Sequence, residues 1–166
     1  MRTPILLLTL LSLPLALAPA QAAQCAAQPQ PGIDWRRCLL EARDLRNVDL
    51  TGAVLRDASL SNSDLRGATL RGAVGYSARF VAADLRGADL TDAELLRADM
   101  TRANLGGARL VGADLRRIRF FRADLRGADL TAARLEGADL LYAQLEGARW
   151  TDGTRTCAAG SVGACR

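Results

Sequence analysis

The sequence contains no histidine, and all 22 of its basic residues are arginine, so lysine is absent as well. Histidine is the side chain that most often transfers protons in catalysis, and it is a frequent ligand of zinc. Without it, and without any other paired acid and base at a recognisable spacing, the sequence offers no candidate catalytic residues. We also expect no metal ligands and no cofactor. The sequence therefore predicts a protein that is not an enzyme.

A hydrophobic run long enough to cross a membrane is also missing. Residues 1–22 begin with Arg2 and continue as an apolar stretch that three prolines interrupt. Ala20-Gln21-Ala22 has the small-x-small pattern of a cleavage site. We therefore predict a signal peptide over residues 1–22 and an exported chain, periplasmic or secreted, with no membrane span after the signal is removed.

A strong charge of either sign is lacking too. The formal net charge is +4 in the full sequence, and it falls to +3 once Arg2 leaves with the signal peptide. So small a charge does not by itself indicate binding to nucleic acid or to an anionic membrane. We expect no nucleic-acid partner.

What the sequence does have is a repeat of five residues. Large apolar residues occupy every fifth position from Trp35 to Trp150, and only Gly75 breaks the series. A small residue, usually alanine, stands two positions before each of them. A period of five matches neither the 3.6 residues of a helical turn nor the alternation of a strand.

A second period of 20 residues explains the first. Similar eight-residue segments begin at Ser63, Ala83, Ala103, Ala123 and Ala143, for example SDLRGATL and ADLRGADL. Five residues a side and 20 a turn describe a coil with four sides, whose large and small apolar residues both point inward. Residues 33–152 then form about six coils, a rod about 29 Å long at the spacing of adjacent strands.

These tandem A(D/N)LXX units resemble those of the pentapeptide-repeat family. The resemblance covers most of the chain after the signal peptide. It implies an all-β fold, a right-handed quadrilateral β-helix (a pentapeptide-repeat solenoid) with leucine or phenylalanine at the central position. It does not imply one function, because a fold can carry several.

The four cysteines flank the repeat. Cys25 and Cys38 lie at its start, and Cys157 and Cys165 lie beyond its end. Two disulfides are expected in an exported chain, and the ends of the rod are too far apart to share one. We predict the pairs Cys25–Cys38 and Cys157–Cys165, which fasten an N-terminal lid or linker over residues 23–32 and a C-terminal cap over residues 153–166. Trp35 and Trp150 are expected to plug the two ends of the apolar column.

Two features of the predicted surface could bind a partner. Aspartates and arginines form neighbouring columns beside the residues from Leu45 to Leu145, which indicates a solvated, salt-bridged face, or alternatively a ladder that binds a polyanion. Outward apolar residues on and beside another side form a candidate partner surface. Its members are Val81, Leu96, Phe121, Leu141 and Tyr142. At Gly75 we expect a local bulge, or else a pocket.

The interpretation that follows is an exported, non-enzymatic structural or protein-interaction module, a monomer or weak homodimer with an unidentified protein partner. The alternative comes from the family: some members resemble duplex DNA and bind the topoisomerase gyrase, which confers quinolone resistance. That alternative requires an acidic surface and a cytosolic location. The basic balance and the predicted signal peptide both disfavour it.

Overall fold

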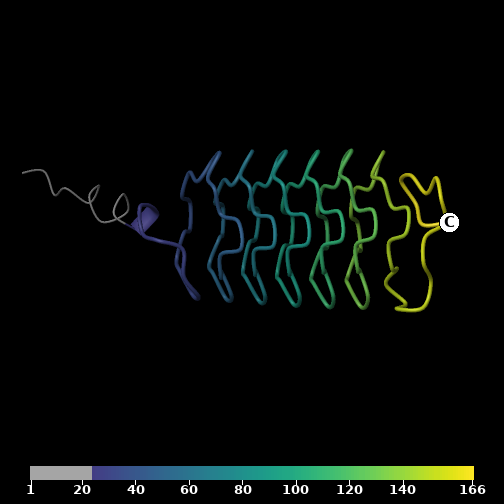
Figure 1. Cartoon of the computed structure of the whole chain (residues 1–166), viewed down its shortest axis with the longest axis horizontal. Coiled ribbons are helices and arrows are strands. Elements are labelled where there is room, and N and C mark those ends of the chain that lie inside the picture. Colours follow the sequence, from purple (N-terminus) through teal and green to yellow (C-terminus); the bar gives the residue numbers. More distant parts are fainter. Residues whose placement is uncertain (1–23) are drawn as a thin grey trace, which may run out of the picture.

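The computed structural model describes residues 24–166, and the predicted signal peptide lies outside the described residues. The chain is a right-handed quadrilateral β-helix, as the repeat and the family resemblance predicted. Figure 1 shows its coils stacked along one long axis, with the N-terminal segment at one end and the C-terminus at the other. Within the described range, helical residues occur only at Gln24 and Cys25.

Each side of a coil consists of two turn residues followed by three extended residues. The middle extended residue forms one parallel bridge to the residue 20 positions further on. We number the sides by the first residue of each series of bridges. Side 1 begins with Asp34↔Val54, side 2 with Leu39↔Ser59, side 3 with Asp44↔Asp64 and side 4 with Asp49↔Thr69.

Backbone hydrogen bonds join each side to the next coil. On side 2, Leu40 N–H donates to the Ser59 carbonyl at 2.7 Å, and Ser59 N–H donates back to Cys38 at 2.9 Å. The corner residue Ala42 donates to Ser61 at 3.0 Å. Because each side repeats this pattern, short three-residue sides satisfy most of their backbone groups without any long strand.

The corners require a left-handed backbone. The second turn residue has a positive φ at every corner from Gly32 to Gly147, and at 14 of these 24 corners it is not glycine. A residue with a Cβ is strained in this conformation, so the hydrogen bonds to the adjacent coils hold it there. Arg37, Ala42 and Tyr142 adopt the same turn as the glycines at the other corners.

The interior is filled by the two residues of each side that the sequence pattern directed inward. Leucines and alanines line the column, and almost all of them are fully buried. Phe80, Met100 and Phe120 are also fully buried, one above another on side 2. Packing of this kind leaves no channel along the axis.

The expected bulge at Gly75 is wrong. Val74 keeps its bridges to Val54 and Glu94, and Gly75 N–H donates to Glu94 at 2.8 Å, so the register continues unchanged. The space of the missing side chain is taken by Leu95, because a Cβ on Gly75 would lie 2.8 Å from its Cδ2. A neighbouring side chain has filled the gap, and neither a bulge nor a pocket forms.

Both ends carry a disulfide. Cys25 pairs with Cys38 and Cys157 with Cys165, which is the pairing expected from the sequence. After Trp150 the chain reverses and runs antiparallel to the last coil, with bridges Arg149↔Thr156 and Gln144↔Val162. Trp35 is buried at the first end, while Trp150 at the other is only half-buried.

Candidate interaction surface

Side 3 carries the predicted columns of aspartate and arginine. Each aspartate bonds to the arginine two residues later at 2.5–2.6 Å. The pairs are Asp44–Arg46, Asp64–Arg66, Asp84–Arg86 and Asp124–Arg126. Arg46 and Arg66 also approach the aspartate of the next coil at 3.6 and 3.7 Å. The arginines on this face are thus already paired with aspartates of the same chain.

The pKa values of these aspartates reflect that pairing. The hydrogen bond from the Arg46 guanidinium, helped by the Arg46 N–H, lowers the pKa of Asp44 to about 2. The arginine two residues on likewise lowers the pKa of Asp84 and Asp124. These carboxylates stay ionised at neutral pH and are poor proton acceptors. The face is best described as a salt-bridged surface, interrupted at Asn104 and Gly106, where both charges are missing.

A different surface lies at the corner between sides 2 and 3 in the last two coils. We call it the aromatic corner, and it consists of Phe121, Arg122, Leu141 and Tyr142. The rings of Phe121 and Tyr142 meet edge to face, with centroids 5.8 Å apart and planes at 76°. The Arg122 guanidinium lies 5.1 Å from the centroid of Phe121 and 5.7 Å from that of Tyr142.

The backbone fixes the aromatic corner in place. Arg122 N–H donates to the Leu141 carbonyl at 3.0 Å, which ties the two coils together at this point. Leu141 and Tyr142 are each 55% exposed, while Phe121 is half-buried. An arginine stacked on two aromatic rings beside an exposed leucine presents apolar, π and cationic chemistry within one small patch.

The other two members of the predicted surface lie apart from the aromatic corner. Val81 is half-buried in the same column as Phe121, with the coil of Thr101 between them. Leu96 lies at the corner between sides 1 and 2, one coil after Tyr76. The structure therefore brings together Phe121, Leu141 and Tyr142, extends the column to Val81, and leaves Leu96 on a separate edge.

Two exposed residues were missed at the sequence level. Leu39 is 72% exposed and Val162 is 46% exposed. The five-residue period could have identified Leu39, because it stands at the outward bridging position before Leu40. Val162 lies in the cap, where no repeat predicts the direction of a side chain. The stacking of Arg122 depends on the left-handed corner, which the sequence pattern does not show.

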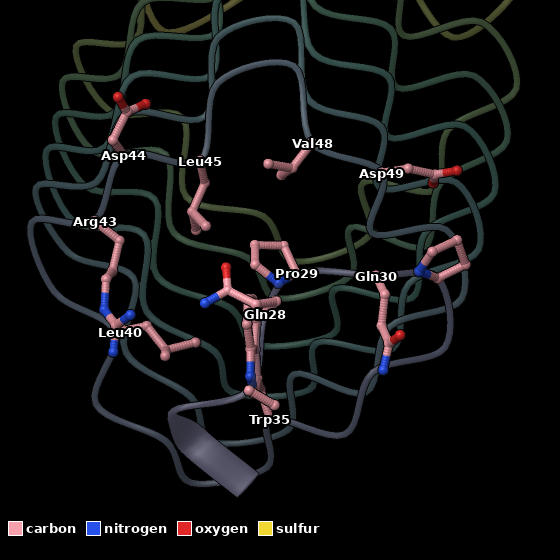
Figure 2. Close-up of a pocket in the computed structure, with 12 residues that line it drawn as sticks. Gln28, Pro29, Gln30, Trp35, Leu40, Arg43, Asp44, Leu45, Val48 and Asp49 are labelled. Carbon is pink, nitrogen blue, oxygen red and sulfur yellow. The ribbon is translucent and has the colours of Figure 1, made fainter. Parts of the chain in front are cut away.

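The N-terminal end contains a hollow of about 460 Å³ between the lid and the first coil (Figure 2). Trp35, Leu40 and Leu45 supply apolar walls, and Arg43 and Asp44 lie at the rim. The Trp35 Nε1 atom is buried and has no hydrogen-bond partner among residues 24–166. The lid thus closes the first coil incompletely, and the Asp44 carboxylate at the rim is already bound by Arg46.

In the described part of the chain, His, Cys, Asp and Glu side chains form no group of three or more that could hold a metal ion. The same residues include no helix with the length and apolar character of a membrane span.

Comparison with known families and structures agrees with this architecture. The sequence profile for pentapeptide repeats matches eight copies, over residues 36–73, 78–117 and 118–149. No curated protein sequence matches the chain.

Among solved structures, two trypsin-treated variants of QnrB1, a plasmid-mediated fluoroquinolone resistance protein, superimpose with TM-scores of 0.52 and 0.51 at 21% and 18% identity. Each match covers 72% of this chain but only 63% and 65% of QnrB1. A pentapeptide repeat protein of the Arabidopsis thaliana thylakoid lumen is 25% identical, with a TM-score of 0.45, over 75% of this chain and 85% of its own.

Proposed function

Because the chain belongs to the pentapeptide-repeat family, we propose that it is an exported, non-enzymatic module that binds another protein in the cell envelope or outside the cell. The observation that carries this proposal is the aromatic corner. It is the place where exposed apolar and aromatic side chains meet on a rod whose neighbouring face is salt-bridged.

The chemistry of the aromatic corner suits a protein partner. Tyrosine and arginine are enriched among the residues that contribute most to protein–protein binding, and both are present here beside Leu141. A partner would cover the 55% of Tyr142 and Leu141 that is now exposed. The backbone beneath them is already held by hydrogen bonds between the coils, so binding would cost little backbone conformational entropy.

Export is supported by the two disulfides together with the leader-like residues 1–22. Disulfides form and persist mainly in oxidising compartments, such as the periplasm or the medium. Both pairs are closed, so no free thiol is left within residues 24–166.

A non-enzymatic role is supported by how the chain uses its reactive groups. The side 3 carboxylates are held by arginines, with their pKa values lowered. The interior is packed with leucine and alanine, which leaves no water-excluding cleft around a reactive pair.

Topoisomerase binding by DNA mimicry is the weaker candidate. It needs a surface that is acidic overall, and on side 3 four of the aspartates are neutralised by an arginine two residues later. The likeness to QnrB1 is below 25% identity and extends to the fold alone.

Two experiments test the proposal. Cell fractionation with thiol alkylation should find a cleaved chain without free thiols in the periplasm or the medium. A full-length, reduced chain in the cytosol would overturn export and would make a gyrase-protection assay the next step.

For the binding surface, Phe121→Asp should abolish co-purification of the partner from the compartment in which the protein is found. Leu39→Asp is the matched control, because it changes an exposed leucine at the opposite end of the rod. Unchanged co-purification with Phe121→Asp, in a chain with an intact far-UV spectrum, would refute the aromatic corner as the binding site.

A further inference from the structure

The small positive charge of the chain is concentrated in one segment. Residues 97–122 contain seven arginines and two aspartates, which gives this segment a net charge of +5. The rest of the described chain, residues 24–96 and 123–166, contains 14 arginines and 16 acidic residues, a net charge of −2. The low total of +3 therefore conceals one strongly basic region on a rod that is otherwise slightly acidic.

The coil geometry gathers six of these seven arginines on one side of the rod. We call residues 96–102 and 116–122 the basic face, and they occupy side 2 and its two corners in two consecutive coils. Asp99 is the one acidic residue of the basic face, and Arg109 lies elsewhere, on side 4. The arginines of the basic face are Arg97, Arg102, Arg116, Arg117, Arg119 and Arg122.

Most of these arginines lack a carboxylate partner. Arg116 bonds to Asp114 at 2.5 Å, and Arg119 bonds to Asp99 at 2.8 Å. The other four are exposed and form no salt bridge within residues 24–166; they are Arg97, Arg102, Arg117 and Arg122. Side 3 differs in this respect, because four of its arginines are paired with an aspartate two residues earlier.

The four unpaired arginines are stacked in pairs. Arg97 and Arg117 occupy the corner between sides 1 and 2 in successive coils, and Arg102 and Arg122 occupy the corner between sides 2 and 3. Successive coils lie about 4.8 Å apart, so the two side chains of each pair leave neighbouring points of the backbone. Like charges in this arrangement repel each other, and an oxyanion bound between them would relieve the repulsion.

A hollow of about 390 Å³ opens at the corner between sides 1 and 2. Its polar lining is already bonded within the chain in part, because Asp99 holds Arg119 and Asp139 accepts the Leu141 N–H at 3.0 Å. The guanidinium groups without a salt bridge in it are those of Arg97 and Arg117. The charged residues that line the hollow, together with the glycine one coil beyond Arg117, are Arg97, Asp99, Arg117, Arg119, Gly137 and Asp139.

We propose that the basic face binds a compact cluster of carboxylates on the protein that contacts the aromatic corner. This inference rests on the proposed function, and it adds that the partner is acidic beside its apolar contact. Arg122 belongs to both surfaces, since its guanidinium lies over the rings of Phe121 and Tyr142. A planar guanidinium binds a carboxylate through two parallel hydrogen bonds, so unpaired arginines select aspartate and glutamate side chains.

The limits of the basic face favour a compact acidic cluster over a long polyanion. Further along the rod, the next coil carries Glu136 and Asp139 at the corresponding corner and side. Across the rod, the neighbouring side 3 carries its column of aspartates. A polysaccharide or nucleic acid that ran in either direction would meet carboxylates of this chain, whereas an acidic patch on a protein fits within two coils.

Fluorescence anisotropy of a labelled peptide of twelve glutamates, titrated with the purified mature protein, tests the proposal. We expect binding that weakens as NaCl rises from about 20 to about 200 mM, because the contacts are exposed ion pairs. Arg97→Gln/Arg117→Gln should weaken binding about tenfold, since it removes charge-assisted hydrogen bonds. Arg37→Gln/Arg149→Gln is the matched control: it removes the same charge from two exposed arginines that lie outside the basic face and have no salt bridge within residues 24–166. It should change the affinity less than about twofold.

The comparison ligand is heparin, a sulfated polysaccharide. Absence of peptide binding, equal weakening by both double variants, or binding of heparin without binding of the peptide would each overturn the acidic partner. Far-UV spectra of the double variants confirm that a loss of binding does not reflect misfolding.

Co-purification separates this inference from the proposed function. Loss of the protein partner in both Phe121→Asp and Arg97→Gln/Arg117→Gln supports both. A partner that Phe121→Asp loses and Arg97→Gln/Arg117→Gln retains in full would overturn the acidic partner and leave the aromatic corner as the binding site. A partner that only the arginine variant loses would overturn the aromatic corner and leave the basic face.

Discussion

The two ends of the rod are closed by the same covalent device but by different backbone structures. At the N-terminal end, the Cys25–Cys38 disulfide holds a lid whose backbone meets the first coil where the two join, with Gly32 N–H donating to the Thr51 carbonyl at 2.8 Å and Ile33 N–H donating to the Gln30 carbonyl at 3.2 Å. At the C-terminal end, the cap pairs with half of the last coil before Cys157–Cys165 closes it. The lid is therefore held mainly by its disulfide, whereas the cap is also held by backbone hydrogen bonds to the last coil.

This difference determines what each end exposes. The tethered lid leaves a hollow beneath it but buries Trp35 almost completely. The paired cap buries Ala143, Leu145 and Ala148 on sides 3 and 4, whereas Leu135, Leu140 and Trp150 stay partly exposed. The parallel stack ends at this coil because the chain reverses after Trp150 and pairs antiparallel with it.

Replacing Trp35 and Trp150 compares how much the buried side chain at each end contributes to the free energy of unfolding. Trp35→Ala should lower the free energy of unfolding by about 3–5 kcal/mol, because it removes a fully buried side chain. Trp150→Ala should cost half of that or less, since its ring is half-buried and is stacked with Arg155 on one side. Denaturant titrations of both variants measure the difference, and equal losses would show that the two ends are sealed equally well.

Removing each disulfide in turn shows how far each end depends on its disulfide and how far on its backbone hydrogen bonds. The closed loops are similar in length, with separations of 13 and 8 residues, so the chain-entropy model assigns each disulfide about 3 kcal/mol. Limited proteolysis should nevertheless distinguish them. The lid should be cut readily in Cys25→Ser/Cys38→Ser, whereas the cap should resist in Cys157→Ser/Cys165→Ser because its backbone hydrogen bonds remain. Equal cleavage would mean that the pairing adds no protection.

Corner residues near the two ends test the backbone strain. Ala42→Gly in the first coil should raise the free energy of unfolding by up to about 1 kcal/mol, because glycine adopts the left-handed turn without strain. Gly147→Ala in the last coil should lower it by about the same amount, with only ordinary contacts around the new Cβ. Thermal unfolding resolves changes of this size, and Gly107→Ala, where a Cβ meets open space, controls for steric effects.

The smallest effect is expected from the exposed aspartate column. The pKa of Asp44 is about 2 in the folded chain, below its ordinary value of 3.8, so its contribution is present above pH 4 and is lost as the pH falls towards 2. Asp44→Asn should therefore flatten the fall in Tm between pH 4 and pH 2. The carboxylate of Asp124 is less exposed, and Asp124→Asn should flatten it more. An unchanged pH profile in both variants would show that these pairs do not stabilise the fold.

Much of the fold could be predicted from the period alone. Inward residues must recur with the geometry of the coil, so the five-residue spacing identified the buried column and its four sides. The left-handed corners at Arg37 or Tyr142 could not be predicted in the same way, because the ladder imposes that conformation against the preference of the residue.

The candidate surface was predicted less completely, for a physical reason. The period gives the side on which a residue lies, and it placed Phe121 and Tyr142 close together. The same period places Leu96 at the preceding corner, apart from them. It does not show that the chain reverses after Trp150, because the cap leaves the repeat. The partial exposure of Leu135 and Leu140 follows from that reversal, because the cap pairs with sides 3 and 4.

The uniform ladder also has a consequence for the rate of folding. Each parallel contact of the rod joins residues 20 positions apart, whichever coil it belongs to. The entropy lost in closing one coil is therefore the same at every step, and it does not grow as coils are added. Once one pair of coils has formed, each further coil can be added to an existing edge. A longer rod of this design should nucleate at any point and zip outward with low relative contact order, so added length would cost little folding speed.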